Sequence, residues 1–145
     1  MSEEKALQKL TNLGNALTRL AEALEKPITD SLAIDGTIQR FEFVFELFWK
    51  TLKDVLELEG IQTNTPKETL QEAYRINWLL NETVWLQMLK DRNQTSHIYS
   101  ETMAKAIYEN IKGYFPEMKR VYNLLIVKLK ETPLEVISDN GSDDE

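Results

Sequence analysis

The 145-residue sequence contains no cysteine and only one histidine, His97. The absence of cysteine excludes disulfides, thiolate metal sites and cysteine nucleophiles. A single imidazole excludes a zinc site built mainly from the histidines of one chain, so carboxylates would be the only other metal ligands. We therefore predict neither a metal nor an organic cofactor.

Long apolar runs and an excess of positive charge are also missing. No apolar stretch approaches the ~20 residues that a membrane-spanning helix needs. The N-terminal segment, MSEEKALQKL, is acidic and helical, whereas a signal peptide is basic and then apolar. We expect a cytoplasmic protein that makes no membrane contact. Its net charge of -7 repels nucleic acid over most of the surface, so any RNA contact is expected to be local.

Glycine and proline are scarce, with five and four residues, and no segment alternates with the period of a strand. Apolar residues instead recur every three or four positions, which indicates amphipathic helices nearly throughout. The expected helices are about 3–25, ended by Pro27; Ser31 or Asp35 to Gly60; a short one after the capping box Thr65–Glu68; one capped by Asn81; and a last one opened by Ser100.

These helices predict an all-α, up-down bundle of four main helices plus a short one, spanning residues 1–132. The strongly aromatic second helix indicates either a thick core or a helix that is buried against a second copy of the chain in a dimer. The remaining residues, 133–145, are expected to be an acidic disordered tail. Leu7 and Tyr74 are expected to face inward, and Gly113 with Pro116 to bend or break the last helix. Phe43 and Trp49 are left on a flank of the second helix, where they are available for a dimer contact.

The segment DRNQTSHIYSE, residues 91–101, is a polar junction between two apolar helices. Arg92 follows Trp85 by seven residues and Met88 by four, so it points along the apolar face. A guanidinium in that place needs a partner, because a buried unpaired charge is costly. His97 comes five residues later and Tyr99 two after that.

Two segments together resemble a known family. The pattern R-x4-H-x-Y, formed by Arg92, His97 and Tyr99, is typical of HEPN proteins that pair with minimal nucleotidyltransferases. The stretch IDGTIQRFEFVFELFWK, residues 34–50, is similar to that family's second-helix signature, which ends in E-L-x-W-K. The resemblance is to the group called nucleotidyltransferase substrate-binding proteins and covers about Leu7 to Leu125.

The resemblance implies a dimeric bundle whose partner is a minimal nucleotidyltransferase encoded nearby. In many such pairs the HEPN member is a metal-independent ribonuclease toxin, which the partner silences, in some pairs by adding AMP to the tyrosine of the motif. By this match Arg92 and His97 would be catalytic, Asn93 would be a supporting polar neighbour, and Tyr99 would be the position of AMPylation.

The residue types suit this chemistry. RNA cleavage without a metal needs a base for the 2′-hydroxyl proton and an acid for the leaving 5′-oxygen, and imidazole serves both roles. A guanidinium holds the charge that develops on the phosphate. One chain offers one histidine, so the hypothesis requires a dimer that brings two motifs together. The expected products carry a 2′,3′-cyclic phosphate and a 5′-hydroxyl.

Plainer interpretations stand beside these. Arg92 could form a structural ion pair with Asp91, Glu101 or another acid, and His97 could be a satisfied junction residue. Tyr99 could be a half-buried aromatic at a helix start.

Glu42 and Glu46 lie one helical turn apart, a spacing that could suit paired carboxylates for a metal, but a solvated helix face shared with Lys50 is the simpler interpretation. Three hypotheses for the whole chain therefore remain open. It is a toxin-like endoribonuclease with RNA as substrate, a non-catalytic substrate-binding or regulatory subunit of the transferase, or a helical scaffold with a chance motif.

Overall fold

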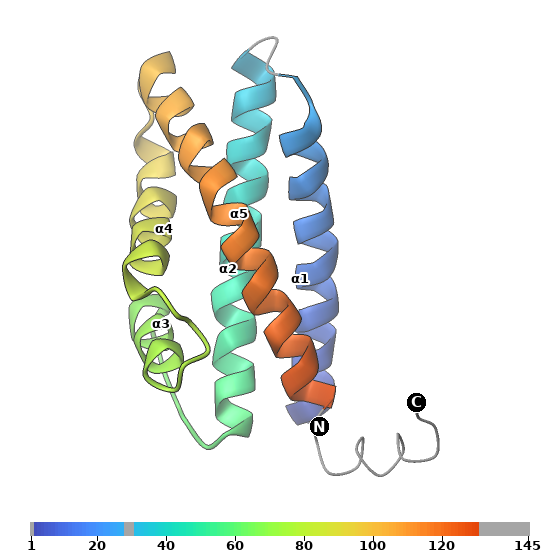
Figure 1. Ribbon diagram of the computed structural model, residues 1–145. Helices are drawn as coiled ribbons and strands as arrows, with labels where there is room; N and C mark the ends of the chain where they lie inside the picture. The colour runs from blue at the N-terminus through green and yellow to red at the C-terminus, as the bar shows by residue number, and fades with distance from the viewer. Residues whose placement is uncertain (1, 28–30, 131–145) are drawn as a thin grey trace.

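The computed structural model describes residues 2–27 and 31–130, which form helices and no strand. The elements in chain order are α1 (Ser2–Glu25), α2 (Ser31–Leu58), α3 (Pro66–Arg75), α4 (Glu82–Gln94), the 3₁₀ turn η1 (Thr95–His97) and α5 (Glu101–Lys130). Figure 1 shows the long helices alternating in direction, with α3 packed at one end. The predicted all-α, up-down bundle with one short helix is confirmed, and the predicted tail lies outside the described residues.

The helix ends follow the local signals of the sequence. Thr65 accepts a hydrogen bond from the backbone N–H of Glu68 at 3.1 Å, and Pro66 occupies the first turn of α3. The Glu68 carboxylate accepts the N–H of Asn64 rather than that of Thr65, so the predicted capping box closes one residue early. Gly60 has a φ of 85° directly after α2, a conformation that a side chain would disfavour.

The last helix does not break. Ser100 accepts the N–H of Met103 at 3.2 Å and opens α5 as expected, and the helix then runs through both Gly113 and Pro116. Pro116 and Lys112, whose carbonyl loses its N–H partner, are both exposed, so water can replace that hydrogen bond. The buried residues on either side hold the helix against the bundle, so the predicted break is wrong, whereas the alternative of a bend stays a prediction.

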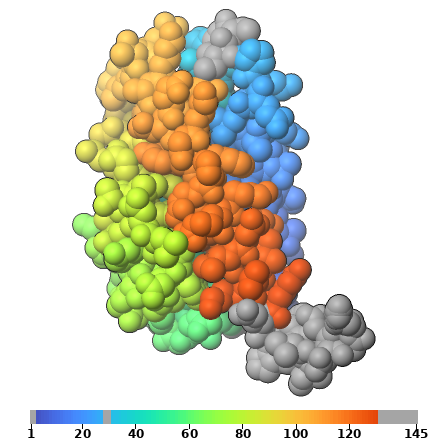
Figure 2. Space-filling model, in the orientation of Figure 1, coloured from blue at the N-terminus to red at the C-terminus, as the bar shows by residue number. Residues whose placement is uncertain are grey.

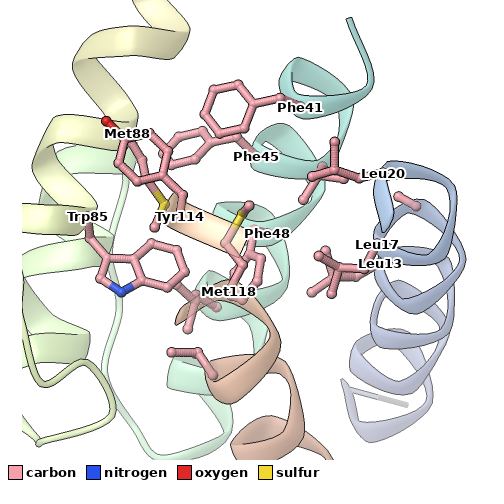
Figure 3. Packing of buried hydrophobic residues seen from close by; sticks show 14 of the residues in the cluster. Leu13, Leu17, Leu20, Phe41, Phe45, Phe48, Trp85, Met88, Tyr114 and Met118 are labelled. Carbon is pink, nitrogen blue, oxygen red and sulfur yellow. The ribbon is translucent and has the colours of Figure 1, made fainter. Parts of the chain in front are cut away.

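Aromatic and aliphatic side chains from the four long helices meet in the middle of the bundle (Figure 3). The ring centroids of Phe48 and Trp85 lie 4.9 Å apart, which places α2 and α4 in direct contact. Gly14 of α1 allows the Tyr122 hydroxyl to approach so closely that an added Cβ would lie 2.3 Å from it. The labelled core residues of Figure 3 are Leu13, Leu17, Leu20, Phe41, Phe45, Phe48, Trp85, Met88, Tyr114 and Met118.

Two residues predicted to face inward do not. Leu7 is 49% exposed because α1 packs mainly on α2 and α5, and the neighbouring Ala6 and Leu10 are the buried residues of that turn. Tyr74 is 42% exposed because the short α3 buries Ala73, and the next position points about 100° away from it. Phe43, by contrast, lies exposed on the flank of α2 as predicted.

The fifth helix, α5, crosses the front of the bundle diagonally, from the side of α4 to the side of α1 (Figures 1 and 2). Its start and the end of α4 therefore lie at the same end of the bundle as the start of α2 (Figure 1). Among the helices of the described ranges, none is long and apolar enough to cross a membrane.

Candidate functional site

The junction between α4 and α5 carries every candidate residue of the sequence motif. Arg92 lies in the last turn of α4, His97 ends η1, and Tyr99 lies between η1 and α5. Since this junction is next to the first half of α2, the motif faces side chains of that helix.

The Arg92 guanidinium forms an ion pair with Glu46 of α2 through Nη2. Its Nη1 also donates to Asn93 Oδ1 at 3.4 Å, so the predicted supporting residue touches the arginine. The Arg92 side chain is 35% exposed, which leaves it between protein and solvent. The structural ion pair considered in the sequence is therefore present, and the acid that forms it is neither Asp91 nor Glu101.

The Glu46 carboxylate is held in its charged form by two cations. Burial alone would raise its pKa, but the hydrogen bond from Lys50 and the charges of Arg92 and Lys50 lower the pKa below its ordinary value of 4.5. Lys50 Nζ lies 3.0 Å from Glu46 Oε2. Glu46 is thus ionised at neutral pH and shares its charge between Arg92 and Lys50.

A second contact joins η1 to α2. The Thr95 hydroxyl lies within hydrogen-bonding distance of Glu42 Oε2 and of the Arg92 carbonyl oxygen, the latter at 2.7 Å. The sequence interpretation of Glu42 and Glu46 as a solvated face with Lys50 is confirmed only for the Glu46–Lys50 pair, because both carboxylates also contact the motif. Their one-turn spacing was visible in the sequence, but nothing there indicated that α4 ends opposite them.

His97 and Tyr99 form a second, more exposed pair. His97 Nδ1 lies 3.4 Å from the Tyr99 hydroxyl, and the two ring centroids are 6.4 Å apart. Tyr99 is 84% exposed, so its interpretation as a half-buried aromatic is wrong: the backbone leaves η1 before α5 begins and carries the ring outward. No hydrogen bond joins Arg92 to His97, although both lie in the part of the chain that the structure describes.

On the face of α4 that is turned toward α5, Asp91 is buried at 5% exposure and accepts three hydrogen bonds. The donors are Gln87 Nε2 at 3.1 Å, Asn110 Nδ2 at 3.0 Å and the Tyr114 hydroxyl at 2.6 Å. Burial, and then the hydrogen bond to Asp91, raise the pKa of Tyr114 far above its ordinary value, so the hydroxyl stays a donor at any physiological pH. In the sequence Asp91 was interpreted only as an ion-pair partner for Arg92, and no local signal there indicated this network.

Two shallow grooves border the junction. One, of about 320 Å³, lies between the starts of α2 and α5 and is bordered by Asp35, Tyr99 and Glu101. The other, of about 620 Å³, lies between α1 and α2 and includes Phe43 and Glu42. Glu42 thus connects the second groove to η1. Across residues 2–27 and 31–130 no group of three or more histidine, aspartate or glutamate side chains is arranged to hold a metal ion.

Known proteins share both the sequence and the fold. A Haemophilus influenzae protein named "Probable ribonuclease HepT" is 33% identical over 99 residues, which are 65% of this chain and 68% of that protein. A crystal structure of a Thermus thermophilus protein matches with a TM-score of 0.74 and 34% identity, over 78% of this chain and 98% of that one.

A second solved structure comes from Haemophilus influenzae and was described as revealing the fold of a substrate binding domain of a nucleotidyltransferase. It matches with a TM-score of 0.69 and 29% identity, over 80% of this chain and 98% of that one. The model of one family, described as nucleotidyltransferase substrate binding protein like, matches residues 8–126, and the chain belongs to this family.

Proposed function

We propose that this chain is the HEPN member of a cytoplasmic two-component, toxin-antitoxin-like system and cleaves RNA without a metal until a minimal nucleotidyltransferase neutralises it. The main support for this proposal is that the α4–α5 junction contains Arg92, Asn93, His97 and Tyr99. The name of the Haemophilus influenzae relative as a probable ribonuclease supports the activity. The family description supports the nucleotidyltransferase as the partner.

In the proposed reaction, His97 takes the proton of the 2′-hydroxyl, and that oxygen attacks the adjacent phosphate. The bond to the 5′-oxygen breaks, and a second imidazole gives that oxygen its proton. Arg92 holds the charge that develops on the phosphate. The products are a 2′,3′-cyclic phosphate and a 5′-hydroxyl, with no water consumed in this step.

The second imidazole comes from a second copy of the chain. The exposed side chain of His97 is accessible to another molecule, and exposed Phe43, in the groove that reaches the motif through Glu42, offers an apolar contact for a homodimer. We expect light scattering of the purified protein to give the mass of a dimer. A monomer that cleaves RNA at full rate would contradict the shared site.

The decisive experiment is RNA cleavage in excess chelator. We expect His97→Ala to lower the rate about 10²- to 10⁴-fold, the usual contribution of a general acid or base. Gln94→Ala is the matched control, because Gln94 is exposed nearby and makes no capping hydrogen bond to η1. Wild-type protein that leaves RNA intact, free of modification and of its partner, would remove the enzymatic proposal.

The proposed modification concerns Tyr99, whose exposed hydroxyl is open to a transferase. We expect co-expression with the partner to add the mass of AMP to wild-type protein and not to Tyr99→Phe. Tyr108→Phe is the control: the Tyr108 side chain is buried, so this variant should still gain the mass of AMP. Equal modification of wild type and Tyr99→Phe would assign the AMP to another residue.

A second candidate function is a non-catalytic substrate-binding or regulatory subunit of the nucleotidyltransferase. It is favoured by the net charge of -7 and by the Glu46 carboxylate, which already occupies the Arg92 guanidinium where a phosphate would bind. This function predicts a stable complex with the transferase and no cleavage of RNA by either the free or the bound protein. Cleavage that disappears in His97→Ala would exclude it.

A further inference from the structure

We propose that Asp91 is a positioning residue: its buried carboxylate fixes the last turn of α4 on α5 and thereby sets where Arg92 and η1 lie. The catalytic consequence of this role rests on the proposed function, whereas its structural consequence does not. Asp91 itself points away from the motif and would touch no substrate.

The contacts of Asp91 form a two-point attachment to α5. Its Oδ2 accepts from both Asn110 and Tyr114, which lie four residues apart on that helix, at 3.0 and 2.6 Å. The third donor, Gln87, belongs to α4 itself. It donates to the other carboxylate oxygen, Oδ1, and therefore does not link the two helices. Hydrogen bonds have strict directions, so two donors from one helix restrain both the rotation and the axial position of the other.

Stability alone does not require a carboxylate here. Burying a charge is costly, and well-packed apolar residues commonly replace buried polar groups with no loss. Both helices also bury apolar side chains in the core, such as Met88 of α4 and Met118 of α5 (Figure 3). The polar group adds a restraint on the rotation of α4 against α5, which apolar packing restrains only weakly.

The direction matters because Arg92 is the next residue. Successive side chains on an α-helix point about 100° apart. When Asp91 is fixed on α5, Arg92 is therefore turned toward α2, where it meets Glu46, and η1 begins within reach of Glu42. The final turn of α4 is thus held between α5 on one side and α2 on the other.

A second polar link between α4 and α5 provides a matched comparison. The Trp85 indole donates to Glu117 Oε2 at 2.9 Å, and Glu117 is also bound by Arg120 at 2.8 Å. Like Tyr114 with Asp91, Trp85 donates to a carboxylate across the seam. This link lies six residues before Asp91, however, and is farther along α4 from the motif.

The test compares Tyr114→Phe with Trp85→Phe by amide hydrogen exchange. Each variant removes one donor to a carboxylate across the same seam, and Trp85→Phe also removes buried volume, so it destabilises the fold at least as much. Helix α3 serves as the reference region within each variant. In Tyr114→Phe we expect amide exchange at residues 92–95 to accelerate about 3- to 10-fold more than in α3. In Trp85→Phe we expect exchange at residues 92–95 and in α3 to change by the same factor.

Two milder variants guard against a failure to fold. Asn110 is exposed, so Asn110→Ala removes the other α5 donor with little risk, and we expect the same local acceleration at smaller size. Gln87→Ala removes the donor that lies on α4 itself and should leave residues 92–95 unchanged. Equal exchange at residues 92–95 in Tyr114→Phe and Trp85→Phe would overturn the proposal.

The kinetics of RNA cleavage provide a second measurement, because a residue that only stabilises the fold would not change kcat selectively. We expect Tyr114→Phe to lower kcat about 10- to 100-fold with KM nearly unchanged, because a misplaced Arg92 loses its contact with the transition state. Trp85→Phe should keep its kcat, and an equal fall of kcat in both variants would overturn the proposal. If the wild type cleaves no RNA, the proposed function fails while the exchange measurements still decide the role of Asp91.

Discussion

The middle of the bundle and the end of α4 differ in the interactions that hold their helices together. In the middle, Phe48 and Trp85 pack against each other with tilted ring planes among other apolar side chains, and both are fully buried. At the end of α4, Asp91, Arg92 and Thr95 each contact a polar group on a neighbouring helix.

Apolar packing depends on volume and tolerates small rotations of a helix, whereas hydrogen bonds and ion pairs depend on direction. The middle of the bundle therefore supplies most of the stability, and the polar end supplies orientation. The residues proposed as catalytic, Arg92 and His97, lie at the end of the bundle where these directional contacts gather. The following predictions test this division, starting with the largest effect.

The largest effect is expected for Phe48→Ala, which empties a fully buried position in the middle of the bundle. We expect it to lower the free energy of unfolding by about 3–5 kcal/mol, measured by urea denaturation. Phe43→Ala on the exposed flank of the same helix is the control and should stay within about 0.5 kcal/mol. Equal losses in the two variants would mean that Phe43 is buried in solution, as in a tight dimer.

A smaller effect is expected for Thr95→Val, which keeps the shape of the side chain and removes the hydroxyl that joins η1 to Glu42. We expect a loss of about 1 kcal/mol in the free energy of unfolding. Thr102→Val in the first turns of α5, where the side chain is exposed, should change stability by less. An unchanged stability in Thr95→Val would show that the Thr95–Glu42 contact is not formed in solution.

The ion pair of Glu46 should make stability depend on pH. The pKa of Glu46 is lower in the folded chain than its ordinary value of 4.5, so the contribution to stability is present above that value and is lost as pH falls through the folded pKa. We expect Glu46→Gln to cost at most about 1 kcal/mol at pH 7. The difference from wild type should shrink in acid below pH 4.5, and a difference that grows there would contradict the lowered pKa.

The smallest effect is expected for Tyr99→Phe, because the Tyr99 ring is exposed and, within residues 2–27 and 31–130, its hydroxyl contacts His97 alone. Thermal unfolding should report a change within about 0.5 kcal/mol. Tyr114→Phe is the comparison, since it removes a buried hydroxyl from Asp91 and should cost more. A large loss of stability in Tyr99→Phe would show that this end of the motif is packed against a second molecule.

The fold was predictable because its signals are local. The capping pattern at Thr65 and Pro66 and the glycine at the end of α2 mark helix ends without reference to the rest of the chain. The aromatic spacing of α2 also indicated its buried face correctly at Phe41, Phe45 and Phe48. Where single positions failed, as at Leu7 and Tyr74, the width of a buried face depended on how many helices cover it.

The candidate site was predictable only in part. The motif residues were singled out by their resemblance to a family pattern, and the need of Arg92 for an acidic partner followed from its place on an apolar face. Which of the 24 acidic residues would meet it was not predictable, because Glu46 lies 46 residues earlier in the chain. The buried role of Asp91 was likewise hidden, since its partners on α5 come 19 and 23 residues later.

The sequence by itself determined the helices, their order and the positions of the residues that we propose as catalytic, because helix periodicity and capping act within a few residues. Only the tertiary structure decided which carboxylates face the motif, which side of α4 is buried and how far His97 and Tyr99 project into solvent. The physical reason is that a helix fixes the angles among its own side chains but not its rotation against its neighbours. That rotation is set by packing and by directional contacts between segments far apart in the chain.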